Sequence, residues 1–154
     1  MANVKAWIQA ARLRTLPLSL SGIIVGTALA QKKGFFELGI FVLALLTTIG
    51  FQVTSNFAND YGDGVKGTDN EDRIGPARAL QSGLLSRPVL KKGIVVSIIV
   101  TMVLAMALIY RAFGTEDLIY VLLFFFLGTL SIWAALKYTI GSNAYGYIGL
   151  GDVF

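Results

Sequence analysis

The sequence predicts an all-α protein, a multi-pass bundle of membrane-spanning helices. Two observations lead to this fold class. Hydrophobic residues make up 55% of the 154 residues, charged residues 14%, and the mean hydropathy is +0.70, which is far too apolar for a soluble domain of this length. The apolar residues also fall into four runs, each near the ~20 residues that a helix needs to cross a bilayer.

The four predicted spans follow one another from the N-terminus. Residues 1–15 are polar, carry Trp7 and basic side chains, and form an amphipathic lead-in at the membrane surface. The first span begins near Ala10 and includes the apolar run 16–30; we interpret it as a span rather than a signal peptide because more spans follow. The remaining spans are expected at about 35–56, 93–110 and 118–136, with a fifth that begins near Tyr147 and is cut off at Phe154.

The basic residues predict the orientation of the bundle. Ten of the 13 Lys and Arg residues lie in the N-terminal segment, in the long connection 57–92 or just after the fourth span, and the other three lie in the opposite connections. Because basic residues accumulate on the cytoplasmic side, the N-terminus and residues 57–92 are expected in the cytoplasm. The expected location is the inner (plasma) membrane.

An acidic stretch, Asn56–Asp72, follows the second span. Five of the nine acidic residues lie between Asp60 and Asp72, at the end of a membrane helix, where carboxylates are costly and typical of a functional site. If the helix continues, Asn56, Asp60 and Asp63 stand at i, i+4 and i+7 and share one face. A hard cation such as Mg²⁺ stabilises oxygen-bearing side chains crowded in this way, and takes its other ligands from water or phosphate.

Two other interpretations of this stretch bear on the metal prediction. A solvated acidic loop between two helices remains an alternative. An EF-hand loop counted from Asp60 has Glu71 at its twelfth position, but it is set aside because Gly64 stands at the fifth position and the preceding helix is apolar all round. The sequence contains no His and no Cys, so a zinc or haem site would have no soft ligands.

The acidic stretch resembles the first aspartate-rich region of the intramembrane aromatic prenyltransferases, the UbiA-like proteins. The matching pattern is Asn56-x-x-Asn59-Asp60-Tyr61-x-Asp63-x-x-x-Gly67-x-Asp69, followed by Gly75-Pro76-x-Arg78 and Ser82-Gly83. Gly67 stands where the family has its last acid, and the shift of that acid to Asp69 is similar to the branch whose acceptor is 1,4-dihydroxy-2-naphthoate. The resemblance also takes in Arg12-x-Arg14-Thr15-Leu16-Pro17 and residues 138–152, and so covers the whole chain.

The resemblance implies a Mg²⁺-dependent transfer of a polyprenyl group from a polyprenyl diphosphate to 1,4-dihydroxy-2-naphthoate, a step of menaquinone biosynthesis. The implied partners are these two substrates and the lipid bilayer, with no nucleic acid. The diphosphate must leave as an anion, whose charge Mg²⁺ and basic residues stabilise. By resemblance and by spacing, the expected metal ligands are Asp60, Asp63 and Asp69, supported by the amides of Asn56 and Asn59, which we also assign to substrate binding.

Basic residues of the same stretch are the expected partners of the diphosphate. We assign Lys66 and Arg78 to substrate binding and catalysis, because both are expected in the same loop as the acidic residues and Arg offers a bidentate fork; a purely topogenic role is the alternative. Lys137 and Tyr138, after the fourth span, are the other expected substrate contacts, although a Tyr at that depth is also ordinary at a membrane interface. The family has Pro where this chain has Ala79 after Arg78, which leaves the loop conformation open.

Members of the resembled family are about twice as long, with nine spanning helices and a second aspartate-rich motif. We therefore interpret residues 1–154 as the N-terminal part of a single transmembrane prenyltransferase domain, a gene fragment, and expect no prenyl transfer from it alone. Two alternatives stay open: a sister enzyme that uses 4-hydroxybenzoate, homogentisate or another aromatic acceptor, and a non-catalytic membrane protein that binds divalent cations. The prenyl chain length and the oligomeric state stay undetermined.

Overall fold

The computed structural model describes residues 4–68 and 75–151, and within these ranges every regular element is a helix, as the sequence predicts. Four of the helices, counting α1 and α2 together as the first, are long and apolar enough to cross a membrane. The elements are α1 (Val4–Ala11), the 3₁₀ helix η1 (Leu13–Thr15), α2 (Leu16–Lys32), α3 (Leu38–Lys66), α4 (Arg87–Phe113), α5 (Leu118–Thr139) and the 3₁₀ helix η2 (Tyr145–Ile148).

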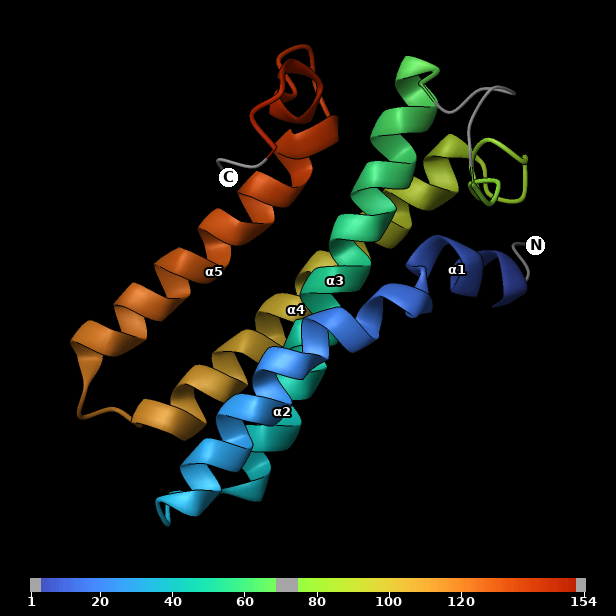
Figure 1. The fold of residues 1–154 in the computed structure, drawn as a ribbon. Coiled ribbons are helices and arrows are strands. Elements are labelled where there is room, and N and C mark those ends of the chain that lie inside the picture. The colour runs from blue at the N-terminus through green and yellow to red at the C-terminus, as the bar shows by residue number, and fades with distance from the viewer. Residues whose placement is uncertain (1–3, 69–74, 152–154) are drawn as a thin grey trace.

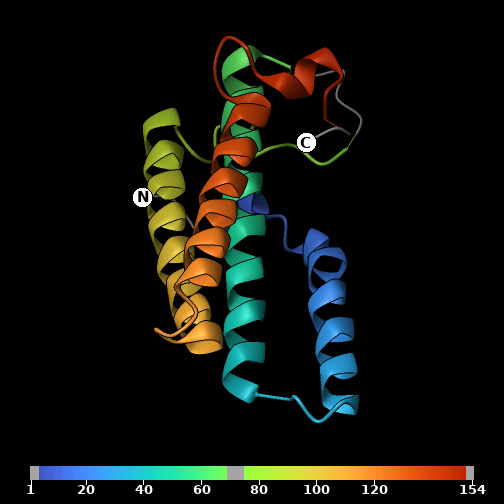
Figure 2. The ribbon, with the colours of Figure 1, turned by 90° about the vertical axis from the view of Figure 1, so that its left-hand side faces the viewer.

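Helix α3 is the centre of the bundle (Figure 1). It contacts α1, α2, α4 and α5, and α4 and α5 also contact each other. Successive long helices run in opposite directions, so the end of α3, the start of α4 and the end of α5 meet at one end of the bundle (Figures 1 and 2). The segments after α3 and after α5 lie at that same end, so the polar residues at the end of α3 lie near those that follow α3 and α5.

The second span is longer than predicted. It was expected to end near Asn56, but α3 continues to Lys66 and ends at Gly67, which adopts a left-handed conformation (φ 73°). Asp60 and Asp63 are therefore helical, and the described part of the connection begins after Lys66 rather than at residue 57. The helix persists past the apolar run because its last turns pack on α5: a Cβ added at Gly62 would lie 2.5 Å from the side chain of Thr139.

The other boundaries also differ from the prediction. The helix that contains the third span begins at Arg87, just after Ser86 and with Pro88 in its first turn, six residues before the apolar run that starts at 93, and the fourth extends to Thr139. The first span is not one helix: it breaks at Arg12, whose φ of 50° is left-handed, and α1 turns away from the axis of α2 (Figure 1). The expected start of a fifth helix is, as far as Gly151, the short 3₁₀ helix η2 followed by a turn.

Small and hydroxyl-bearing side chains let α3 approach its neighbours closely, as is common between membrane helices. On the α4 side, a Cβ at Gly50 would lie 2.5 Å from Oγ1 of Thr101, and that hydroxyl pairs with the hydroxyl of Thr54 at 3.4 Å. On the α5 side, the Thr139 hydroxyl donates to the carbonyl of Ala58 at 3.1 Å. These contacts fix the rotation of α3, and with it the direction in which its polar residues point.

An exposed ion pair joins α3 and α4 at the opposite end of the bundle. Glu37 caps α3 by accepting hydrogen bonds from the backbone of Gly39 (3.0 Å) and Ile40 (2.6 Å), and it accepts one from Arg111 Nη2 at 3.1 Å. Hydrogen bonding by Arg111, and then by the two backbone N–H groups, lowers the pKa of Glu37 to about 2. The start of α3 is therefore tied to the end of α4 by a carboxylate that stays charged.

Candidate functional site

The last turns of α3 carry the polar residues singled out in the sequence. Because α3 continues through Asn59 and Asp60, the spacing of Asn56, Asp60 and Asp63 does place them on one face of a helix. The three side chains nevertheless have different partners: Asn56 contacts α1, Asp60 the backbone of the α3–α4 connection, and Asp63 side chains.

Asp60 anchors the connection between α3 and α4. Its side chain is buried, with 1% of the residue's surface exposed, and its two oxygens accept hydrogen bonds from the backbone N–H groups of Ala79 (3.1 Å) and Leu80 (3.3 Å). Gly64, one turn later, leaves room for Leu80, since a Cβ there would lie 2.6 Å from Leu80 Cδ2. The structure thus gives Asp60 a loop-binding role, which the sequence analysis did not anticipate.

Asp63 lies at the open end of the site. Its side chain is 16% exposed, and it forms an ion pair with Arg78 Nη2 at 3.2 Å. The other carboxylate oxygen accepts hydrogen bonds from the hydroxyl of Tyr147 and, at 3.4 Å, from that of Thr68. Asp63 and Arg78 therefore lie in contact, although 15 residues separate them in the sequence.

Lys66, in the last turn of α3, lies next to Asp63. Its ammonium nitrogen is 3.9 Å from the ring centroid of Tyr147, within the range of a cation–π interaction. Asn59, Asp63 and Lys66 recur every three or four residues and so form a polar stripe along one side of α3. This stripe, together with Arg78 and Tyr147, is called the polar site below.

The remaining residues predicted from the sequence lie in the polar site or next to it, except Asp69. Asn59 accepts a hydrogen bond from the Thr139 hydroxyl at 3.3 Å, and Asn56 is buried and donates to the carbonyl of Ala11 at 2.8 Å. Tyr138 packs edge-on against Tyr145, with ring centroids 5.4 Å apart. Lys137 is exposed at the end of α5, and Asp69 lies outside the described residues.

Sequence analysis missed two contributors to this region, Thr139 and Tyr147. Thr139 ends α5 and Tyr147 follows it, and both are separated from their partners on α3 by 80 or more residues. The signal in the sequence was that both fall within the segment 138–152, where the resemblance to the family continues.

Two hollows adjoin the polar site. The first has a volume of about 300 Å³, lies between α1 and the α3–α4 connection, and is lined by Arg12, Arg14 and Arg78 among others. The second, of about 330 Å³, lies between α2, α3 and α5, and its lining includes five polar side chains at the depth of the spans: Ser19, Thr48, Gln52, Ser55 and Ser131. Polar groups inside spanning helices usually face a protein interior or a cavity.

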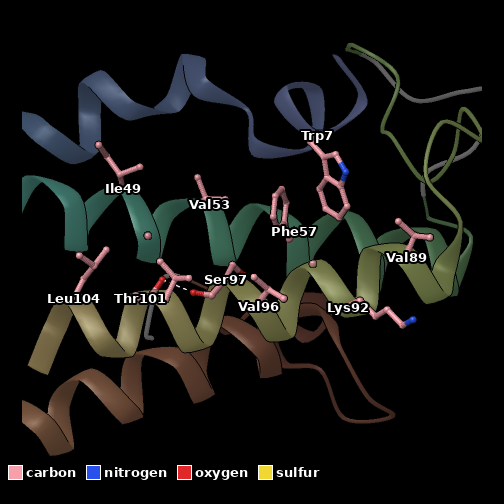
Figure 3. A pocket seen from close by; sticks show the side chains of 13 residues that line it. Trp7, Ile49, Val53, Phe57, Val89, Lys92, Val96, Ser97, Thr101 and Leu104 are labelled. Carbon is pink, nitrogen blue, oxygen red and sulfur yellow. Dashed lines mark hydrogen bonds between the residues drawn. The ribbon is translucent and has the colours of Figure 1, made fainter. Parts of the chain in front are cut away.

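A larger groove of about 590 Å³ lies between α3 and α4 beneath Trp7 (Figure 3). Its lining is almost entirely apolar, and Lys92 stands at one end. Trp7 packs on Phe57, and its ring fits against α4 because residue 93 is glycine. Phe57 and Asn59 are two residues apart, hence ~160° apart around the helix axis, so this groove is separate from the polar stripe.

A sequence profile of the UbiA prenyltransferase family matches residues 19–153. The chain belongs to the UbiA prenyltransferase family. The match takes in α3, the connection to α4 and the segment that carries Tyr147, so every residue of the polar site lies within it. Helix α1, which lines a neighbouring hollow, lies outside the match. No solved structure matches the chain significantly.

Curated relatives of this UbiA-family chain carry the name 1,4-dihydroxy-2-naphthoate octaprenyltransferase. The relative from Escherichia coli is 43% identical over 99% of this chain, that from Haemophilus influenzae 47% over 98%, and that from Mycobacterium tuberculosis 33% over 99%. In each case the matched region is 49% of the relative, so the chain spans about half the length of these proteins.

The donor set of the polar site suits a divalent cation. Among the described residues no three acidic side chains gather as a metal cluster. Mg²⁺, however, usually takes only one or two protein carboxylates and completes its shell with water and substrate phosphate. The oxygens of Asn59 and Asp63, on successive turns of α3, fit that requirement.

Proposed function

We propose that this chain takes part in the transfer of a polyprenyl group from a polyprenyl diphosphate to 1,4-dihydroxy-2-naphthoate. The observation that carries the proposal is the family match over residues 19–153, supported by relatives of that name at 43% and 47% identity. In the proposed reaction an aromatic carbon of the acceptor bonds to the first carbon of the prenyl chain. The bond to the diphosphate breaks, its electron pair leaves with the diphosphate, and the aromatic carbon loses its proton.

The polar site would bind the diphosphate end of the donor. Arg78 and Lys66 would pair with the leaving diphosphate, Arg78 through its planar fork and Lys66 as a point charge. A divalent cation, which we propose is Mg²⁺, would neutralise the developing negative charge. Asp63 and Asn59 would hold that cation, together with Asp69.

The adjoining hollows suit the other parts of the substrates. Arg12 and Arg14 line the smaller hollow, where they would neutralise the carboxylate of the acceptor. The alternative is that they only anchor the first helix at the membrane surface. The cavity lined by Gln52 and Ser55 lies along α3 from Asn59 toward the membrane interior. This position supports the proposal that the reacting ends of the two substrates bind there. The bound substrates would have to exclude water from this cavity, so that the allylic cation is protected from hydrolysis.

A chimeric protein tests this function. Residues 1–154 would replace the matching half of the Haemophilus influenzae relative, and the chimera would be expressed in membranes without 1,4-dihydroxy-2-naphthoate prenyl transfer of their own. With a polyprenyl diphosphate, the naphthoate and Mg²⁺, mass spectrometry is expected to detect prenylated product. The 154-residue chain alone is expected to give none.

The controls separate the alternatives. Replacement of the naphthoate by 4-hydroxybenzoate or homogentisate is expected to abolish product; preferred use of either would assign the chain to a sister enzyme. A chimera that inserts into the membrane and binds divalent cations, yet transfers no prenyl group to any acceptor, would favour the cation-binding alternative and contradict the proposal.

We further propose that the polar site faces the cytoplasm of the inner membrane, on the ground of the ten-to-three distribution of Lys and Arg. Because the chain has no cysteine, the exposed Ser82 provides a unique label as Ser82→Cys. That cysteine is expected to resist a membrane-impermeant thiol reagent in intact cells and to react after lysis. The matched variant Lys33→Cys, at the other end of the bundle, is expected to react in intact cells, and the reverse pattern would overturn the orientation.

A further inference from the structure

We propose that Tyr147 is a positioning residue that keeps Asp63 and Lys66 apart and orients both side chains for their ligands. The proposal deepens, and rests on, the function proposed above for the polar site. It concerns a residue outside the aspartate-rich stretch, in the segment that follows α5.

Asp63 and Lys66 would pair with each other in an isolated helix. They stand at i and i+3, a spacing at which opposite charges on a helix attract. Among the described residues, however, the ammonium of Lys66 lies over the Tyr147 ring, 3.9 Å from its centroid. The carboxylate of Asp63 instead contacts the Tyr147 hydroxyl on one oxygen and Arg78 on the other. One tyrosine therefore engages the acid through its hydroxyl and the base through its ring.

This arrangement matters for the proposed ligands. An ion pair between Asp63 and Lys66 would offset the negative charge required by a cation and the positive charge required by a diphosphate. The Tyr147 ring is neutral, so it does not offset the positive charge of the Lys66 ammonium. The Tyr147 hydroxyl donates to one oxygen of the Asp63 carboxylate and so fixes the direction of the carboxylate's remaining lone pairs. Both groups are thereby held ready for ligands of opposite charge.

The backbone that carries Tyr147 is itself held in place. Tyr145 donates a hydrogen bond through its hydroxyl to the carbonyl of Ala134 at 2.8 Å. Gly146 lies against Tyr138, where an added Cβ would be 2.7 Å from the Tyr138 carbonyl oxygen. Tyr147 is thus presented to α3 by a segment anchored on α5, which suits a residue that orients others.

The test compares Tyr147→Phe, which removes only the hydroxyl, with Tyr147→Leu, which also removes the ring. Mn²⁺ binding to the chimera, in the presence of inorganic diphosphate, would be followed by electron paramagnetic resonance whether or not product forms. Tyr147→Phe is expected to weaken Mn²⁺ binding roughly tenfold, the usual effect of losing one hydrogen bond to a charged group. Its KM for the polyprenyl diphosphate should change by less than about twofold, because the ring still holds Lys66. Tyr147→Leu is expected to raise this KM roughly threefold as well.

Tyr145→Phe is the matched control: it removes a hydroxyl that anchors the same segment but does not contact Asp63, so it is expected to weaken Mn²⁺ binding clearly less than Tyr147→Phe does. Equal shifts in Tyr145→Phe and Tyr147→Phe would mean a merely structural role and would overturn the proposal. So would wild-type Mn²⁺ binding in Tyr147→Phe, or no Mn²⁺ binding in the unmutated chimera. If the expected Mn²⁺ shifts occur in a chimera that makes no product, the positioning role stands and the prenyl-transfer function fails.

Discussion

Asp63→Asn in the chimera is expected to lower the rate of prenyl transfer at least ~100-fold, the scale seen when a group that stabilises transition-state charge is removed. The amide keeps the shape of the side chain but only one oxygen, so it can accept a hydrogen bond from Arg78 or from Tyr147 but not from both, and the ion pair with Arg78 is lost. It loses the negative charge that would hold the divalent cation. The measurement is product formation as a function of Mg²⁺ concentration, in membranes that contain equal amounts of chimera.

Asp117→Asn provides the matched control for this prediction. Asp117 precedes α5 at the opposite end of the bundle, and its side chain does not cap that helix. It is expected to retain the unmutated rate. Full activity of Asp63→Asn at every Mg²⁺ concentration would show that Asp63 has no part in binding the cation.

Asp60→Ala is expected to lower the stability of the folded protein, and to affect prenyl transfer through that loss of stability. The substitution leaves the backbone N–H groups of Ala79 and Leu80 without their acceptor, and Ala79 is fully buried. A buried donor that loses its partner costs about 1–3 kcal/mol, which applies to Ala79; Leu80 is only part-buried and adds less. Thermal unfolding in detergent should show a lower midpoint, and trypsin should cut more readily after Arg78.

The milder variant Asp60→Asn tests the same idea, because it keeps one oxygen acceptor and should lie between Asp60→Ala and the unmutated chain in unfolding midpoint. Asp63→Ala, whose carboxylate accepts no backbone hydrogen bond from this connection, should be destabilised less than Asp60→Ala. An Asp60→Ala variant with an unchanged midpoint and unchanged trypsin resistance, but no activity, would contradict the loop-binding role and favour direct ligation of the cation.

Comparison of α3 with its prediction shows where local sequence information ends. The apolar run 38–51 predicts a membrane helix, because apolar side chains favour the bilayer core and a helix satisfies its own backbone hydrogen bonds there. The run says nothing about the further turns to Lys66, which are polar. Those turns are helical in the structure because they pack against Thr139 and the connection around Leu80. Likewise, no pattern marked the break at Arg12, where α1 turns to lie against α3.

The sequence by itself determined the all-helical class, the four spans and the one-face spacing of Asn56, Asp60 and Asp63, because these depend only on apolar content and on the period of the helix. It also indicated the family, because the residues of the acidic stretch that resembles the family's motif are close together in the sequence. Only the tertiary structure separated Asp60, which binds the backbone of the connection, from Asp63, which meets Arg78 and Tyr147. The physical reason is that these contacts join residues 15 to 84 positions apart, and helix packing, not local spacing, decides which of them meet.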